Sequence, residues 1–167
     1  MEKLVKKIAR YTVFSSVLLA MSFSAIGQMT YSPDHVTRFN MTNQCKNCDL
    51  SGASLSGNHS GALLIASNLT GSTGRGTFSM SSFTDSNLSG ADWSGANLSY
   101  GQLNGTVLTQ TNFMGANLSF ANFEKSNTNG AVFDYAILFG AKITQQQLDS
   151  AASYCNATLP DGSKKKC

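Results

Sequence analysis

The sequence predicts an all-β solenoid, a fold in which one short unit repeats along the chain and each unit packs on the next. The first observation is a large apolar residue at every fifth position from Phe78 to Leu148, with Thr128 as the exception. The second is a small residue two positions before each of these up to Ile143, from Gly76 to Ala141. A period of five fits neither an α-helix nor a β-strand. It indicates repeats that bury their apolar side only by stacking on their neighbours.

Four blocks carry the most specific form of the repeat: ADWSG at 91–95, ANLSY at 96–100, ANLSF at 116–120 and ANFEK at 121–125. They resemble the A-(D/N)-(L/F)-x-x unit of the pentapeptide repeat family, and the resemblance extends over residues 45–148. The resemblance implies a right-handed quadrilateral β-helix with four pentapeptides per coil. A narrow square coil agrees with one large and one small side chain per side, and with Asn, Ser, Thr and Gly at the corners.

Twenty residues per coil sort the large positions into columns. Leu98, Leu118 and Leu138 fall in one column. Trp93, Phe113 and Phe133 fall in another, where we expect aromatic rings to lie on aromatic rings. Thr128 should place a polar side chain in its otherwise apolar column. Trp93 is larger than the usual Leu or Phe, and we expect it to make its coil bulge outward.

The earlier repeats are less regular. The steps from Leu55 to Leu64 and from Leu69 to Phe78 are each one residue short of two repeats. We expect distorted corners to absorb both slips, and the glycine-rich segment 70–77 to form an irregular turn. This segment lacks the spacing of a phosphate-binding loop.

The first 27 residues have the pattern of a secretory signal peptide. A basic start precedes an apolar run over residues 12–23, and Ala25-Ile26-Gly27 places small residues where a signal peptidase cleaves. The apolar run is too short for a convincing membrane span, and none is expected after cleavage. The sequence therefore predicts a periplasmic or secreted protein.

Removal of the leader changes the charge balance. The leader holds four of the twelve basic residues and one of the nine acidic residues, which leaves eight of each. The mature chain is thus neutral, and its basic tail, Lys164–Lys166, is expected to be solvated. Because no basic stripe with interleaved aromatic residues is present, we expect no nucleic acid partner.

All four cysteines lie in the predicted mature chain, where an oxidising compartment favours disulfides. Cys45 and Cys48 precede most of the repeats, whereas Cys155 and Cys167 follow the last. Several coils separate the two pairs by about 20 Å, which exceeds the reach of a disulfide. We therefore pair Cys45 with Cys48 and Cys155 with Cys167. The segments around Cys45 and Cys155 also resemble the beginning and ending of many secreted family members.

The two ends of the solenoid need covers. Residues 28–44 are predicted to cap the N-terminal end of a β-helix spanning 45–143. The segment 144–167 is predicted to form a capping helix and a disulfide-closed tail. Thr144 and Gln147 have the spacing of a capping box, and we expect the helix to continue to Tyr154 with its apolar residues on one face.

Catalytic chemistry is not indicated. The Cys45–Cys48 motif lacks the surroundings of a thioredoxin-like redox pair, and together with His59 it lacks a fourth metal ligand. His35 and His59 are otherwise isolated and expected to be exposed. Carboxylates are sparse, and no nucleophile, base and acid converge. We expect no enzyme, no cofactor and no metal site.

The sequence does contain an outward apolar signal. Met80, Tyr100 and Phe120 occupy the same corner of successive coils, and Tyr135 and Phe139 add apolar side chains near the last coil. Either the C-terminal segment packs over this surface, or the surface binds a protein partner or a second copy in a homodimer.

Three functions follow, and the sequence identifies no partner for any of them. The first is a non-catalytic exported scaffold that binds another protein. The second comes from the resemblance, because some family members mimic DNA and inhibit type II topoisomerases. The export signal and neutral charge argue against it, since a mimic of DNA should be strongly acidic. The third is thiol redox chemistry at Cys45 and Cys48.

Overall fold

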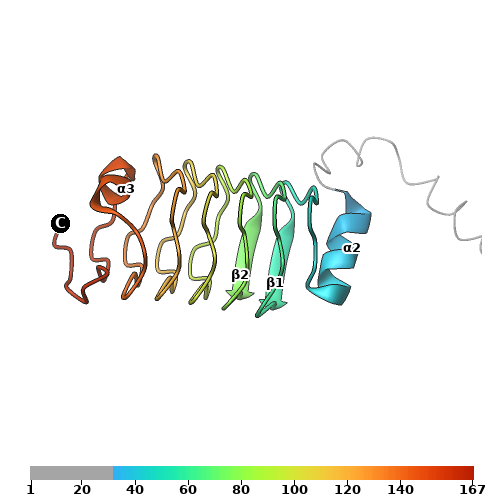
Figure 1. Cartoon of the computed structure of the whole chain (residues 1–167), viewed down its shortest axis with the longest axis horizontal. Helices are drawn as coiled ribbons and strands as arrows, with labels where there is room; N and C mark the ends of the chain where they lie inside the picture. The colour runs from blue at the N-terminus through green and yellow to red at the C-terminus, as the bar shows by residue number, and fades with distance from the viewer. Residues whose placement is uncertain (1–31) are drawn as a thin grey trace, which may run out of the picture.

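The computed structural model describes residues 32–167, which form an elongated stack of coils with a helix near each end (Figure 1). The helices are α2 (Pro33–Thr42) and α3 (Gln145–Ser150), and the strands are β1 (Ser54–Asn58) and β2 (Thr73–Thr77). The predicted signal peptide lies outside the described residues. Within 32–167, no helix is long and apolar enough to cross a membrane.

Residues twenty positions apart pair in parallel from one coil to the next. One ladder of bridges runs through Thr77, Asn97, Asn117 and Ile137. Beside it, the amide of Leu98 donates to the carbonyl of Asn117 at 2.7 Å, and the amide of Asn117 donates to the carbonyl of Ala96 at 2.9 Å. Because each coil exchanges such bonds with its neighbours, the backbone is satisfied without long strands.

Each pentapeptide forms one side of a coil and ends in a tight turn. In one unit, the amide of Ala121 donates to the carbonyl of Leu118 at 3.0 Å, which closes a four-residue turn. Phe120 holds the third place of this turn with φ of 58°, as a type II turn requires. Asn117 Oδ1 accepts a bond from the amide of Ser119 at 3.1 Å. The turn itself therefore selects the observed order of Asn, large residue, Ser, left-handed residue and small residue.

The large residues of the repeat fill the interior of the stack. The column of Leu98, Leu118 and Leu138 and the column of Trp93, Phe113 and Phe133 are fully buried. Phe113 and Phe133 stack with their ring centroids 5.5 Å apart. The small position departs from the prediction at one place: Gly76 lies in β2 and is exposed, not inward.

The two early slips are absorbed by strands, so the predicted irregular turn over 70–77 is wrong. β1 and β2 pair in parallel with a register of nineteen residues. Thr73 and Thr77 then bridge to Asp92 and Asn97, so a step of four residues along β2 matches a step of five residues along the next coil. An extended strand advances about 3.3 Å per residue. It therefore spans this corner with one residue fewer than a turn does.

Trp93 is accommodated by a glycine in the coil below it. Gly74 pairs with the backbone of Asp92 and is buried at an inward position. A Cβ atom at Gly74 would collide with the indole ring of Trp93. The ring turns edge-on to Phe78 and Phe83, with centroids at 4.7 and 5.1 Å. The predicted extra bulk of Trp93 thus occupies space that a missing side chain leaves free.

The first described coil is covered by α2, a helix that the sequence reasoning did not predict. Pro33 begins it, and Asn43 ends it in a left-handed conformation. Its residue Phe39 is fully buried and lies 4.6 Å from the ring of His59, which lies 5.2 Å from Phe78. The expectation that His59 is exposed is therefore wrong. Position 59 is five before Leu64, so the repeat period itself places it inward.

The C-terminal helix is shorter than predicted. The capping box of Thr144 and Gln147 is present, but α3 ends at Ser150 and does not reach Tyr154. Thr128 explains the place of the helix, because its buried hydroxyl donates to the carbonyl of Gln147 at 2.7 Å. After α3 the chain resumes the coil, through bridges from Ser153 to Val132 and from Thr158 to Ile137.

Candidate functional site

The candidate site is a row of exposed side chains that we call the outer ladder. It consists of Met80, Tyr100 and Phe120, which share one corner of successive coils, and Phe139 beside them. The exposed fractions of Met80, Tyr100 and Phe120 are 65%, 54% and 43%. These are large apolar side chains, and contiguous exposed groups of this kind usually mark a contact surface.

The backbone at this corner disfavours such residues. Met80, Tyr100 and Phe120 have φ of 57°, 59° and 58°, in the left-handed region that is uncommon for residues with a side chain. The same turn position at other corners is often glycine, as at Gly95 and Gly115. The ladder residues therefore occupy positions where the backbone alone favours glycine.

The rings of the outer ladder contact one another. Tyr100 and Phe120 stack with centroids 5.0 Å apart and planes inclined by 11°. Phe139 meets Phe120 edge-on at 5.5 Å. Gly140, next at this corner, makes room for the Phe120 ring, since a Cβ atom there would lie 2.5 Å from it. Stacking turns the ring faces toward one another and leaves ring edges toward solvent.

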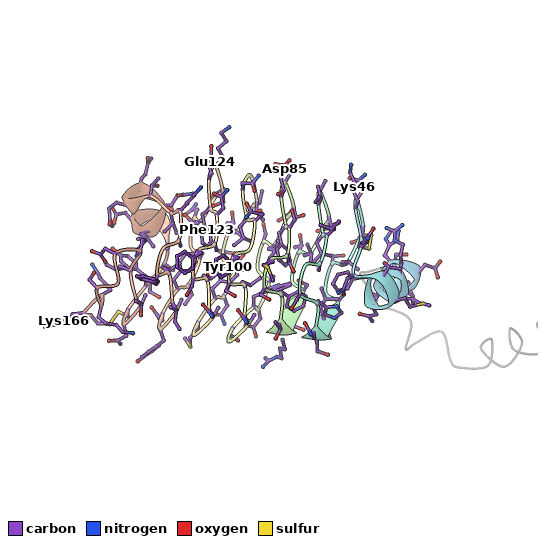
Figure 2. All side chains as sticks on the ribbon, turned by 60° about the horizontal axis from the view of Figure 1, so that its bottom comes forward. Lys46, Asp85, Tyr100, Phe123, Glu124 and Lys166 are labelled. Atoms are coloured by element: carbon purple, nitrogen blue, oxygen red, sulfur yellow. A yellow bond between two sulfur atoms is a disulfide. The ribbon has the colours of Figure 1, made fainter. Side chains whose placement is uncertain are left out.

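Charged side chains are absent from the side of the coils that carries the ladder. This side, which we call the ladder side, comprises residues 77–80, 97–100, 117–120 and 137–140. The next side along the chain carries Asp85, Glu124, Lys125 and Lys142. In Figure 2, Asp85 and Glu124 project from one edge of the stack, and Tyr100 does not lie on that edge.

The C-terminal segment reaches only one end of the outer ladder. A Cβ atom at Gly162 would lie 3.5 Å from the ring of Phe139, so the tail passes close to it. α3 docks elsewhere, where Gln147 Nε2 donates to the carbonyl of Phe123 at 2.7 Å. Tyr135 is exposed at a neighbouring corner and makes no ring contact with the ladder within residues 32–167.

The family profile described as "Pentapeptide repeats" matches residues 78–115 and 111–145, with eight copies of the repeat. This part of the chain belongs to the pentapeptide repeat family. No curated protein matches the sequence significantly.

Solved structures of other pentapeptide repeat proteins are similar to this chain. A protein of the Arabidopsis thaliana thylakoid lumen is 22% identical over 83% of this chain and 91% of its own, with a TM-score of 0.48. HetL from the cyanobacterium Nostoc sp. strain PCC 7120, described as involved in heterocyst differentiation regulation, is 23% identical over 73% and 66%, with a TM-score of 0.35.

A trypsin-treated form of QnrB1, described as a plasmid-mediated fluoroquinolone resistance protein, is also similar. It is 15% identical over 70% of this chain and 69% of its own, with a TM-score of 0.40. At these identities the likenesses do not indicate what this pentapeptide repeat chain binds.

Both predicted disulfides are present in the structure, and each closes one end of the repeats. Cys45 pairs with Cys48, and Cys155 pairs with Cys167, across Cα separations of 5.4 and 5.2 Å. In the C-terminal tail, which ends at Cys167, Lys164 forms an antiparallel bridge with Thr158. The second disulfide thus holds this returning segment against the last partial coil.

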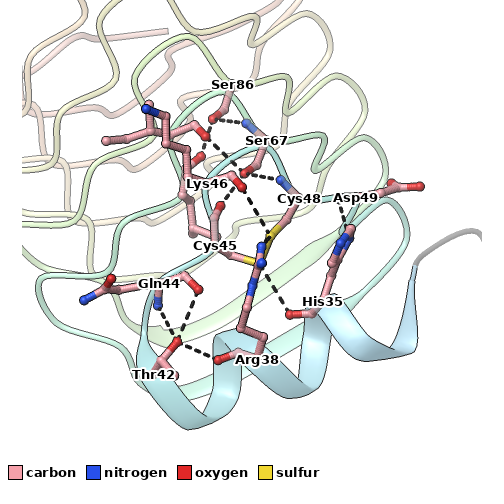
Figure 3. Close-up of a disulfide and its surroundings, with 12 residues drawn as sticks. His35, Arg38, Thr42, Gln44, Cys45, Lys46, Cys48, Asp49, Ser67 and Ser86 are labelled. Carbon is pink, nitrogen blue, oxygen red and sulfur yellow. Dashed lines mark hydrogen bonds between the residues drawn. A yellow bond between two sulfur atoms is a disulfide. The ribbon is translucent and has the colours of Figure 1, made fainter.

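The first disulfide lies under α2, where sequence reasoning missed a cation (Figure 3). Arg38 Nη2 lies 2.5 Å from the sulfur of Cys48 and 3.5 Å from that of Cys45. A neighbouring cation stabilises a thiolate. Cys45 and Cys48 are however almost fully buried, with exposed fractions of 0% and 2%. A reductant would reach the sulfurs only after α2 had moved.

The carboxylates with lowered pKa have structural roles. The side-chain hydroxyl of Ser51 donates to Asp49 and lowers the pKa of that carboxyl, and Ser94 does the same for Asp92. In both cases the carboxylate also accepts the amide two residues on, as in an Asx turn. A lowered pKa keeps these groups ionised, which suits turn capping and not proton donation.

Elsewhere within residues 32–167 the structure offers no coordinating chemistry. A groove of about 710 Å³ beside α3 is lined by residues that include Lys125, Lys142 and Gln147. The Gln147 amide in it already donates to the carbonyls of Phe123 and Ser126. Across residues 32–167, no three His, Cys, Asp or Glu side chains gather where a metal ion would bind.

Proposed function

We propose that this chain is an exported, non-catalytic scaffold that binds another protein through the outer ladder. In this proposal the coils form a right-handed quadrilateral β-helix, and the outer ladder lies along one of its corners. The observation that carries the proposal is the stack of Tyr100 on Phe120, two exposed rings at left-handed positions.

The free energies of backbone strain and ring contact at this corner favour a role of the rings in binding over a role in the stability of the fold. A side chain in the left-handed region costs about 1–2 kcal/mol relative to the right-handed conformation. An aromatic pair contributes about 0.5–1.5 kcal/mol beyond its burial. The contact between Tyr100 and Phe120 therefore offsets only part of the backbone cost at these two positions. Folding alone gives no reason to prefer rings over glycine there.

Export is supported by the leader pattern of residues 1–27 and by two disulfides, one at each end of the repeats. Disulfides persist in the periplasm and outside the cell and are rare in the cytosol. The expected compartment is therefore periplasmic or extracellular, and a partner would be met there.

Mimicry of DNA is the second candidate, and the charge of the chain disfavours it. A topoisomerase inhibitor of this class would present a dense acidic surface in place of phosphates. Here the mature chain has as many basic as acidic residues, and the ladder side is uncharged. A supercoiling assay with the mature protein tests this candidate, and we expect no inhibition at stoichiometric concentration.

Thiol redox chemistry is the third candidate. Arg38 beside Cys48 favours a thiolate, but the burial of both sulfurs opposes exchange with a partner. Thiol titration of the native protein in millimolar glutathione distinguishes the two effects. With alkylation and peptide mapping as the readout, we expect no free thiol at Cys45 or Cys48 until the protein is denatured.

Protein binding is tested by capture on the immobilised mature chain from an exported-protein fraction. The test variant is Tyr100→Ser/Phe120→Ser, and the matched control is Met114→Ser, an exposed apolar residue on another side of the coils. A protein retained by the wild type and control but lost with the double variant supports the proposal. Equal capture by all three contradicts it.

A further inference from the structure

We infer that the partner of the outer ladder is a second copy of this chain, docked ladder side to ladder side with the two solenoid axes antiparallel. The inference rests on the proposed function, since it identifies the occupant of the same surface. In such a dimer the two-fold axis passes between the levels of Tyr100 and Phe120. Tyr100 of each copy then faces Phe120 of the other.

Charge is the first argument for self-pairing. The chain has 21 charged residues, but the four segments of the ladder side contain none. Like charges placed opposite one another would oppose a symmetric contact, and a charged partner would be recognised through opposite charges. An uncharged surface of Asn, Ser, Tyr, Phe and Met has neither feature. Its closest complement is a surface of the same composition.

The straightness of the ladder is the second argument. Met80, Tyr100 and Phe120 follow one corner of successive coils, so they form a column along the solenoid axis with a rise of about 4.8 Å per coil. A two-fold axis perpendicular to such a column superposes it on itself with the order reversed. The surface is therefore compatible with the two-fold geometry of an isologous interface.

The orientation of the rings is the third argument. Because Tyr100 and Phe120 stack on one another with planes inclined by only 11°, the ladder offers ring edges outward. A sugar ring binds to an exposed aromatic face, which this stack does not provide between the two residues. The outward ring edges, together with the exposed side chain of Met80, can instead pack side by side against the same apolar edges of a second ladder.

The size of the surface predicts a reversible dimer. The ladder extends over four coils, a length of about 15 Å. A stable interface buries about 800 Å² on each partner, and a ladder of this length with its flanking Ser and Asn residues is smaller. We therefore expect monomers and dimers to exchange, with the dimer fraction rising as the protein concentration rises.

The experiment is sedimentation velocity of the mature chain, residues 28–167, over a hundredfold range of concentration, with paired charge variants at Ser99 and Ser119. These two residues flank the ladder, and the antiparallel arrangement places each opposite the other in the second copy. The same turn position accepts charge elsewhere in the fold, as at Lys46, Glu124 and Asp134. The variants should therefore fold, which circular dichroism checks.

We expect the wild type to shift from monomer to dimer as its concentration rises. Ser99→Asp/Ser119→Asp and Ser99→Lys/Ser119→Lys should each remain monomeric, whereas their equimolar mixture should dimerise. A wild type that stays monomeric throughout, or a mixture that does not recover dimers, overturns the inference. If the wild type is monomeric but ladder-dependent capture of another protein persists, self-pairing fails and the proposed function stands. If that capture also fails, both fall.

Discussion

Two aromatic stacks with nearly the same internal geometry lie in different surroundings. Phe113 and Phe133 stack inside the coils with centroids 5.5 Å apart, and Tyr100 and Phe120 stack outside them at 5.0 Å, with planes inclined by 11° in both pairs. The inner pair is fully buried, whereas about half of each outer ring is exposed. Burial explains the inner rings. The outer rings lack that explanation, which is why we assign them to binding.

The largest effect is expected from the inner stack. Phe113→Ala should lower the free energy of unfolding by about 3–5 kcal/mol, because it removes a fully buried ring and leaves a cavity. Ser99→Ala, at a partly exposed turn position, serves as the control and should change stability by less than about 0.5 kcal/mol. Denaturant melts measure both. Small and equal losses would contradict the assignment of Phe113 to the interior.

A smaller loss of stability is expected at Gly74 in β2, which contacts Trp93 in the column of Trp93, Phe113 and Phe133. Gly74→Ala should cost about 1–3 kcal/mol, because the added methyl group collides with the ring of Trp93. The double variant Gly74→Ala/Trp93→Phe should cost less than the sum of the two single changes, since a smaller ring relieves the collision. Strict additivity of the three melts would mean that Gly74 does not accommodate Trp93.

An aromatic residue placed at a glycine corner outside the outer ladder tests how a ring at such a corner affects stability. Gly95 has φ of 68°, and a Cβ atom there would meet nothing within 4 Å. Gly95→Phe should therefore destabilise the fold by about 1 kcal/mol through backbone strain alone. Thermal melts check this. A gain in stability would show that a lone ring at such a corner is favourable by itself, and that the outer ladder needs no binding partner to explain it.

The smallest change in stability is expected at the ladder itself. Phe120→Gly removes the ring contacts with Tyr100 and Phe139 but also relieves the left-handed strain, so the free energy of unfolding should change by less than about 1 kcal/mol. The same variant should lose dimerisation in sedimentation experiments. A loss of several kcal/mol would place Phe120 with the inner rings, as a residue kept for stability.

The regular coils were predictable because the residues of each pentapeptide specify both its turn and the side chains that point inward. In the unit Asn117–Ala121 the identity of every residue follows from one turn and one inward direction. The disulfide pairing followed from the separation of the two ends. The outward direction of Tyr100 and Phe120 followed from the same register, although their stacking did not, because the period fixes the corner and not the rotamers.

The predictions failed where a tertiary partner replaces the repeat. β2 is glycine-rich and resembled a turn, but its pairing with β1 and the size of Trp93 require a strand with an inward glycine. His59 was expected to be exposed as an isolated histidine, yet rings on both sides and a hydrogen bond of 2.6 Å to Asn43 make it a core residue. The early end of α3 reflects the return of the chain to pairing with Val132.

The most direct test places a photoreactive benzoyl-phenylalanine at position 120 and, in a second variant of the mature chain, at position 133. Phe120 lies on the outer ladder and Phe133 in the inner column. Illumination of the concentrated protein should give a crosslinked dimer from position 120 and only uncrosslinked monomer from position 133. No crosslink between copies from position 120, or equal yields from both positions, would contradict the assignment of the outer ladder to a contact between copies.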